Sequence, residues 1–285
     1  MWLSGVMFPC LGFFPDMYIF SDFRSAMRLA LKARFLFMSF CVVVVLILAT
    51  LLSAYFGGRQ PATVALDVGI SAIRLMVPFL IVLVVQELLS REFDRRYYLN
   101  SLTYPRPRSG LLLGRFAAVA ILVLGLLLVL GGVQIGLVCF ISAGYSQATP
   151  VDLGWPYLVV SAFIAVDFFV LTALAVFLSV VASTPNFVLI GTIGFMLVAR
   201  SYGYIVDLLN NELGLVGDPE SYRSGLGALG YLLPDLGALD MRALALYGEW
   251  GFLPVDWSWL LISSFGYIVA LVALALFALQ RKRFS

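Results

Sequence analysis

The sequence predicts an all-α integral membrane protein with six transmembrane helices. Hydrophobic residues make up 62% of the 285 residues, charged residues only 12%, and the mean hydropathy is +1.02. Soluble domains carry roughly one quarter charged residues, so water is not the main solvent of this chain. A helix needs roughly 20 apolar residues to cross the hydrocarbon layer, and six stretches meet that need. Little length is left for a soluble domain, so residues 1–285 are expected to form a single transmembrane domain.

Residues 1–34 are predicted to form an N-terminal segment that includes an interfacial amphipathic helix. Arg24, Arg28 and Lys32 recur at helical spacing on one side, and apolar residues form a second stripe. Ser21 is a candidate N-cap for this helix. The basic side would face lipid headgroups and the apolar side the acyl boundary, so membrane lipid is an expected partner.

Three of the predicted spans are free of charge, and three contain a charged residue that needs a partner. The uncharged spans are 35–55, 116–142 and 257–279. The charged spans are 68–89 with Arg74, 157–181 with Asp167 and 187–206 with Arg200. The charged stretches remain predicted spans because neighbouring helices shield ionised groups and satisfy a backbone kinked by a proline such as Pro78.

Basic residues indicate which side of the membrane each loop faces. Most of the 18 Lys and Arg residues precede the first span, lie between the second and third spans, or follow the sixth. The segment 207–256, between spans five and six, is acidic instead. The positive-inside rule therefore predicts a multi-pass protein of the cell inner (plasma) membrane with cytoplasmic N- and C-termini.

The two loops that flank the fifth span differ in length. Residues 182–186 form a very short turn, which predicts that spans four and five are antiparallel neighbours. The segment 207–256 is much longer and rich in Leu, Gly and aromatic residues. Because an unstructured loop this apolar is unfavourable, short re-entrant helices dipping into the outer leaflet are predicted there.

The stretch 87–115, after the second span, is the most informative part of the sequence. Its first part has helical spacing with mixed charge and is predicted to form a cytoplasmic coupling helix. Prolines then break the helix, and a second short apolar helix is predicted to lead into the third span. Two helices joined at a proline break would form a rigid surface that suits docking to a cytosolic partner. The residues assigned to it are Glu87, Arg91, Glu92, Arg95, Leu99, Leu102, Pro105, Arg108, Gly114 and Arg115.

Within this stretch the chain resembles the ABC type-2 transporter permeases. Their signature places an acidic residue, a leucine pair, a proline, an arginine and a Gly-Lys or Gly-Arg step after the second span. Here these are Glu92, Leu99, Leu102, Pro105, Arg108, Gly114 and Arg115. The amphipathic helix, the re-entrant helices and the basic tail Arg281 to Arg283 are similar to the family's plan. Pro234, Asp235 and Asp240 also resemble a segment of the branch associated with multicopper-enzyme maturation.

The resemblance implies the transmembrane subunit of an ATP-driven exporter. The permease would form the translocation pathway as a dimer, either a homodimer or a pair with a paralogue. Two copies of a separate cytosolic ABC ATPase subunit would contact residues around 87–104. ATP and Mg would be bound by that partner, and no cofactor or metal is expected in this chain.

The sequence argues against most enzyme classes. The chain has no histidine, which removes Ser-His and HExxH chemistry, and it has no G-x-x-x-x-G-K-[ST] phosphate loop. ATP hydrolysis is therefore expected from another chain, and nucleic acid is not an expected partner. A secondary transporter coupled through Asp167 and a membrane assembly scaffold without ATP coupling remain as alternatives.

Four polar residues inside the spans are candidates for a role in the pathway. Asp167 lies near the midplane, where an ionised side chain costs roughly 2.5 to 3.5 kcal/mol. We expect it to pair with Arg74 or Arg200 and to line or lock the translocation cavity, or else to form a buried structural pair away from it. Gln134 lies within the Gly132 to Gly136 spacing, where an interhelical contact is favoured over a substrate contact.

Overall fold

A computed structural model describes residues 15–31, 35–90, 108–144, 151–182, 184–211 and 234–281. All regular elements in these ranges are helices. Six are long and apolar enough to cross a membrane, which confirms the predicted fold class. The elements are α1 (Pro15–Ala30), α2 (Leu36–Phe56), α3 (Pro61–Val85), the π-helix η2 (Gln86–Ser90), α6 (Arg108–Gly144), α7 (Trp155–Val181), α8 (Pro185–Asn211), α10 (Arg242–Tyr247), the 3-10 helix η3 (Trp250–Phe252) and α11 (Trp257–Arg281).

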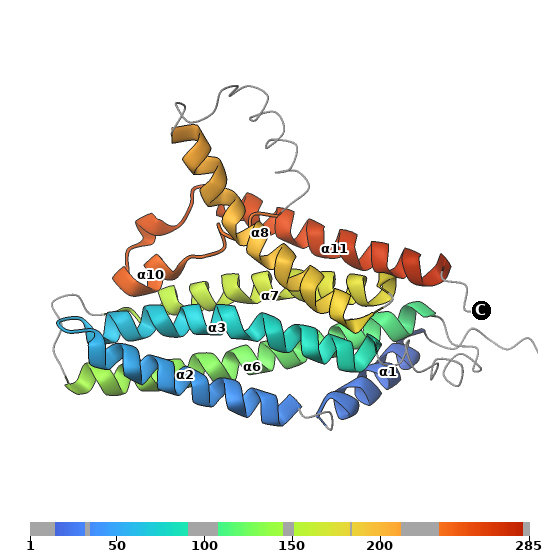
Figure 1. Ribbon diagram of the computed structural model, residues 1–285, viewed down its shortest axis with the longest axis horizontal. Helices are drawn as coiled ribbons and strands as arrows, with labels where there is room; N and C mark the ends of the chain where they lie inside the picture. The colour runs from blue at the N-terminus through green and yellow to red at the C-terminus, as the bar shows by residue number, and fades with distance from the viewer. Residues whose placement is uncertain are drawn as a thin grey trace, which may run out of the picture.

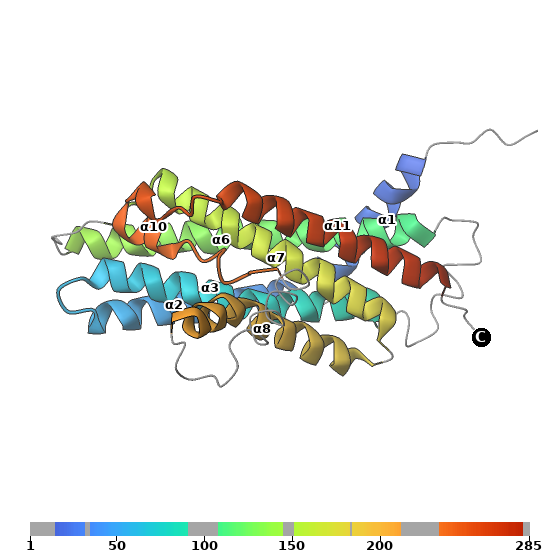
Figure 2. The same ribbon diagram turned by 90° about the horizontal axis from the view of Figure 1, so that it is seen from above.

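Helix α7 is the centre of the bundle. It contacts α3, α6, α8 and α11, and the two views show it between α11 and the layer that contains α3 (Figures 1 and 2). In its most apolar window 72% of the residues are buried, against 11% in α2. A charged residue on α7 is therefore enclosed by protein, whereas α2 has most of its surface outside the bundle.

Prolines mark the starts of several helices. Pro61 opens α3, and Pro156 lies in the first turn of α7. Helices α1 and α8 begin at Pro15 and Pro185. The first turn of a helix has no intrahelical partner for its N–H groups, so the missing N–H of proline costs nothing there. Because α1 already begins at Pro15, the prediction that Ser21 is its N-cap is wrong.

The third span is one continuous helix. Helix α6 runs for 37 residues from Arg108, so the separate short helix predicted ahead of this span is absent. Neither Gly110 nor Gly114 interrupts it, since a single glycine weakens a helix by about 1 kcal/mol without breaking it. At 1.5 Å per residue α6 is about 55 Å long, which exceeds a hydrocarbon layer of about 30 Å.

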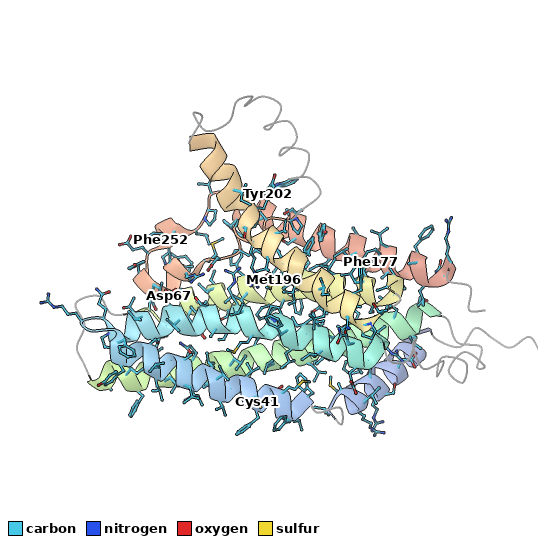
Figure 3. The ribbon with its side chains drawn as sticks, in the orientation of Figure 1. Cys41, Asp67, Phe177, Met196, Tyr202 and Phe252 are labelled. Atoms are coloured by element: carbon cyan, nitrogen blue, oxygen red, sulfur yellow. The ribbon has the colours of Figure 1, made fainter. Side chains whose placement is uncertain are left out.

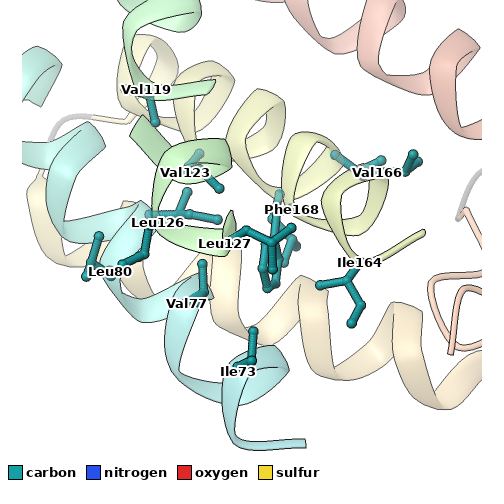
Figure 4. Close-up of a cluster of buried hydrophobic side chains, with 14 of the residues drawn as sticks. Ile73, Val77, Leu80, Val119, Val123, Leu126, Leu127, Ile164, Val166 and Phe168 are labelled. Atoms are coloured by element: carbon teal, nitrogen blue, oxygen red, sulfur yellow. The ribbon is translucent and has the colours of Figure 1, made fainter. Parts of the chain in front are cut away.

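The core of the bundle is a set of interdigitated aliphatic side chains. Ile73, Val77 and Leu80 of α3 face Val123 and other apolar residues of α6, with residues of α7 beside them (Figure 4). Phe168 of α7 is fully buried in this cluster. Dense packing of this kind holds α3, α6 and α7 as one unit.

The outer surface of the bundle is apolar as well. Large side chains such as Phe40 and Leu48 of α2 and Val269 of α11 are more than 60% exposed. Cys41 also lies on the outer face of α2 (Figure 3). Acyl chains are the natural solvent of such a surface, which agrees with a protein whose helices are in contact with lipid.

The two ends of the bundle differ. Helix α1, the start of α6 and the end of α11 lie at one end, and α10 lies at the other (Figures 1 and 2). Helix α1 packs on α6 through buried Ala26 and Ala30, while Arg24 and Arg28 are on its exposed side. Arg281 closes α11 at the same end. Basic residues therefore gather at the end opposite α10.

Candidate functional site

A carboxylate with two arginine partners lies in the middle of the bundle. Asp167 is fully buried on α7, about 18 Å along the helix axis from Trp155. Its Oδ2 accepts a hydrogen bond from Nη2 of Arg200 on α8 at 2.6 Å and is 3.4 Å from Nη2 of Arg74 on α3. The expected pairing of Asp167 is therefore present with both arginines, and it joins three spans.

Arg74 extends the cluster toward the segment that follows α8. Its Nη1 is 2.6 Å from Oδ2 of Asp240, and its Nη2 also donates to the carbonyl oxygen of Leu236 at 3.1 Å. The backbone oxygen of Arg74 in turn accepts from Nη1 of Arg200 at 3.0 Å. Arg74 is thus the residue through which α3, α7, α8 and the 234–241 stretch meet.

Arg242 fastens the same segment to α3. Its guanidinium pairs with Asp240, lies 3.0 Å from Oδ1 of Asp67 and donates to Oγ of Ser71 at 2.7 Å. Asp67, Ser71 and Arg74 are spaced four and three residues apart, so they share one face of the helix. Figure 3 shows Asp67 where α3 passes close to α10. We call residues 234–247 the strap, since they lie along this face of α3.

Apolar contacts hold the strap in place beside these ion pairs. Pro234, Leu236, Leu239 and Met241 are buried, and the last three belong to the main core cluster. Gly237 lies against the backbone of α8, because a Cβ there would be 2.6 Å from the carbonyl oxygen of Arg200. The strap therefore packs between α3 and the middle of α8.

The charges of the six residues cancel. Asp67, Asp167 and Asp240 balance Arg74, Arg200 and Arg242. Three buried atoms nevertheless have no hydrogen-bond partner among the described residues: Oδ1 of Asp167 and the Nε atoms of Arg74 and Arg200. Leaving a buried polar atom without a hydrogen bond costs free energy, so binding of a further polar group or a water molecule at these three atoms would be favourable.

Asp240 and Arg242 are both charged at neutral pH. Burial alone would raise the pKa of Asp240, but the hydrogen bond from Arg242 and the charges of Arg74 and Arg242 outweigh it and lower that pKa. The hydrogen bond to Asp240 raises the pKa of Arg242 despite burial. Since the pKa of Asp240 is depressed on folding, its contribution to stability is present above its unfolded value of about 4 and is lost as the pH falls through the folded value.

Removing the Arg242 guanidinium is expected to loosen the strap without unfolding the bundle. Arg242→Met keeps most of the side-chain volume but loses the bonds to Asp240, Asp67 and Ser71. Because this side chain is one third exposed, we expect a loss of only about 1 kcal/mol, which is roughly fivefold faster amide exchange in the strap. Hydrogen–deuterium exchange of residues 234–247 measures it.

The matched control is Arg59→Met, which removes an exposed guanidinium from the turn between α2 and α3. This variant should leave exchange in the strap unchanged. Equal exchange in Arg242→Met and the parent protein would contradict the role given to Arg242.

Gln134 belongs to a different site. It is fully buried on α6, donates from Nε2 to the carbonyl oxygen of Ala65 on α3 at 2.9 Å, and accepts from Oγ1 of Thr50 on α2 at 3.1 Å. The side chain lies against Gly69. This is the geometry of a contact between helices, and among the described residues the hydrogen bonds of Gln134 go to Thr50 and Ala65, outside the charged cluster.

Within the described part of the chain, no other helix closely approaches the two glycines beside Gln134. A Cβ at Gly132 or Gly136 would meet no atom of the described chain within 4 Å. Close approach occurs instead at Gly69, on the partner helix α3. A contact of Gly132 and Gly136 with a second chain stays a prediction.

Only part of the predicted coupling region falls within the described residues. Six of its members lie outside them: Arg91, Glu92, Arg95, Leu99, Leu102 and Pro105. Glu87 is half-buried in η2, Arg108 begins α6, and Gly114 is buried. Arg115 is only 8% exposed, and its Nη1 donates to the carbonyl oxygen of Leu88 at 2.7 Å. Arg115 therefore reaches a neighbouring helix rather than the surface.

Sequence reasoning missed three members of the cluster. Asp67 was placed just outside the second span, which in fact starts at Pro61. Asp240 and Arg242 lie in the long acidic segment 207–256, for which the sequence predicts no contact with the spans. The signal that could have found Asp67 is its spacing of seven residues from Arg74, which puts both on one helical face.

Comparison with known families gives the chain an identity. The profile described as "ABC-2 family transporter protein" matches residues 29–200, which is more than half of the chain and extends from α1 to Arg200 in α8. A comparison with curated proteins gave no match. The match does not distinguish the multicopper-enzyme branch. With six apolar helices and this family match, the chain belongs to the ABC-2 transporter family and is a multi-pass membrane permease subunit of an ABC transporter.

Proposed function

We propose that this permease is the transmembrane half of an ATP-driven exporter that works as a dimer with two copies of a cytosolic ATPase. The observation that carries the proposal is the family match over the helices that contain Arg74, Asp167 and Arg200. The absence of a phosphate loop in the sequence supports a separate motor chain. The ATPase, rather than this permease, would bind ATP and Mg.

The end of the bundle rich in basic residues is proposed to face the cytoplasm. Arg24, Arg28 and Arg281 gather there, as the positive-inside rule requires for an inner-membrane protein with both termini inside. Helix α1 then lies at the cytoplasmic membrane surface, with its arginines toward headgroups. Helix α10, at the end of the strap, lies toward the opposite side of the membrane, where the acidic segment 207–256 would form re-entrant structure.

The charged cluster is proposed to line or lock the translocation cavity. Asp167, Arg74 and Arg200 lie deep in the bundle and come from three different helices, so relative motion of those helices must change their distances. Their three unpartnered atoms offer polar contacts to a passing molecule. Gln134 is instead proposed to serve as a contact between helices.

Isolation of the complex tests the proposal. The chain is coexpressed with a nucleotide-binding subunit from the same genome, purified in mild detergent and reconstituted in proteoliposomes. We expect copurification and vanadate-sensitive ATP hydrolysis. Glu92→Lys combined with Pro105→Ala should lose ATPase binding, because it reverses a charge and removes the proline break in the predicted contact region.

Glu249→Lys is the matched control, since it reverses an exposed acidic charge at the end where α10 lies. It should leave ATPase binding intact. A stable wild-type complex that contains no ATPase and shows no vanadate-sensitive activity would overturn the exporter proposal and favour a scaffold or a secondary transporter.

Asp167→Asn separates a cavity role from a purely structural pair. The amide has the same shape and still accepts a hydrogen bond, but it carries no charge to balance Arg74 and Arg200. We expect at least tenfold slower efflux of the compound that copurifies with the complex. Unchanged efflux together with reduced stability would show that the pair is only structural.

A further inference from the structure

The end of α3 has an unusual backbone. At Gln86 the α-helix passes into the π-helix η2, which ends at Ser90. π-helices account for well under 1% of residues and occur mostly as single turns, frequently at functional sites. Their i→i+5 hydrogen bonds make the turn wider than an α-helical turn. The wide turn here lies at the start of the predicted coupling region 87–115 and includes Glu87.

Two side-chain hydrogen bonds tie this turn to other helices. Nε2 of Gln86 donates to the carbonyl oxygen of Pro185, the first residue of α8, at 2.6 Å. Nη1 of Arg115 on α6 donates to the carbonyl oxygen of Leu88 inside η2 at 2.7 Å. Leu88 and Leu89 are fully buried. Two short hydrogen bonds therefore hold this turn, one to α8 and one to α6.

Helix α8 is the element that would move if the hydrogen bond from Gln86 transmitted a displacement of η2. It has few neighbours, since its main contacts are with α7 and α3, and its far end leaves the bundle (Figure 1). Helix α7 ends at Val181 and α8 begins at Pro185, so only a short link joins the two helices. Arg200 lies about 22 Å along α8 from Pro185, in contact with Asp167.

We propose that η2 is a mechanical joint that passes displacement of the coupling segment to α8 through Gln86 and to α6 through Arg115. The proposal rests on the proposed ATP coupling and adds its internal route and its positioning residues. Movement of η2 pulls the start of α8 through the Gln86 bond. The resulting tilt of α8 shifts Arg200 relative to Asp167, which links the ATPase side to the charged cluster.

The test measures movement of α8 directly and needs no knowledge of the substrate. Cys10, Cys41 and Cys139 are replaced by alanine, and spin labels are placed at Leu36 and Asn186, which are exposed at the starts of α2 and α8. Electron–electron distances are recorded in the full permease–ATPase complex, without nucleotide and trapped with ATP and vanadate. The parent complex is expected to show a nucleotide-dependent distance change.

Gln86→Leu and Arg115→Met are each expected to reduce this change by half or more, measured in complexes in which bound ATPase has been verified. Arg115→Lys should restore part of it, because the ammonium group still donates to the Leu88 carbonyl oxygen. Gln280→Leu and Arg59→Met are the matched controls, as both alter exposed side chains elsewhere. If Gln86→Leu does not assemble, Gln86→Asn shortens the side chain by one methylene and serves in its place.

The outcomes separate the two proposals. A parent complex that binds no ATPase overturns the proposed function and this inference with it. If the parent complex hydrolyses ATP while the distance between the two labels stays constant, the proposed role of η2 is overturned and the proposed function is not. A full distance change in both Gln86→Leu and Arg115→Met, with the complex intact, overturns it as well.

Discussion

Replacement of Asp167 by leucine is expected to destabilise the protein more than any other single substitution in the charged cluster. Among the described residues, Arg200 then keeps only the carbonyl oxygen of Arg74 as a hydrogen-bond acceptor, and two guanidinium groups remain side by side in a buried site. Breaking a buried ion pair by removing one member costs about 3–5 kcal/mol. The loss is measured by unfolding in mixed micelles with increasing SDS.

A second substitution should reverse much of that loss. In Asp167→Leu combined with Arg200→Leu, the remaining Arg74 still pairs with Asp240 at 2.6 Å, so no arginine of the cluster lacks an acidic partner. Apolar replacement of a complete buried pair is often neutral. We expect the double variant to recover at least half of the loss seen in Asp167→Leu.

The control pairs Asp167→Leu with Arg59→Leu, which removes an exposed arginine outside the cluster and should recover nothing. If the two cluster substitutions simply add, Asp167 and Arg200 do not interact energetically. The ion pair between them would then contribute no stability.

Pairing of Asp167 could be predicted from sequence because the hydrocarbon layer enforces it. An ionised group in a span needs a partner, and Arg74 and Arg200 are the basic residues inside the other predicted spans. The sequence left the choice between them open, and the structure has both. Asp240 offered no such constraint, because a carboxylate in a loop is ordinary when the loop is in water. Its place in the cluster depends on the strap packing against α3.

Span existence was likewise easier to predict than span ends. Apolar composition over about 20 residues locates each crossing, since the bilayer sets that length. The ends depend on local chemistry instead. Prolines at the starts of α3 and α8 extend those helices beyond their purely apolar stretch, and Arg108 to Arg115 continue α6 where a break was predicted. Charged residues in the first turns of a helix, outside the hydrocarbon layer, are compatible with helical structure.

Gly69→Ala is expected to have the second-largest effect, at the junction of α2, α3 and α6. A Cβ at this position would be 1.9 Å from Nε2 and 2.4 Å from Oε1 of Gln134. The side chain of Gln134 is not free to retreat, because it is fully buried and bonded to Ala65 and Thr50. Overpacking of this kind typically costs about 1–3 kcal/mol, measured by the same SDS unfolding.

Truncation of the glutamine should rescue the glycine variant. Gln134→Ala alone is expected to cost about 0.6–1.7 kcal/mol, the range for interhelical hydrogen bonds in membranes. In the double variant with Gly69→Ala, the new methyl group fills space that the glutamine vacated, so the total loss should be smaller than the sum of the two. Gly132→Ala is the control on α6, where a Cβ meets no atom within 4 Å and stability should hold or rise.

Additive losses in the double variant would mean that Gly69 is needed for a reason other than room for Gln134. A large loss in Gly132→Ala would place a second chain against that face of α6, since nothing within the described chain is close enough to clash. Comparison of the Gly69 and Gly132 variants therefore distinguishes packing within one permease from packing between two permeases. An isolated permease suffices for the first comparison, and the second is read from whether the loss depends on protein concentration.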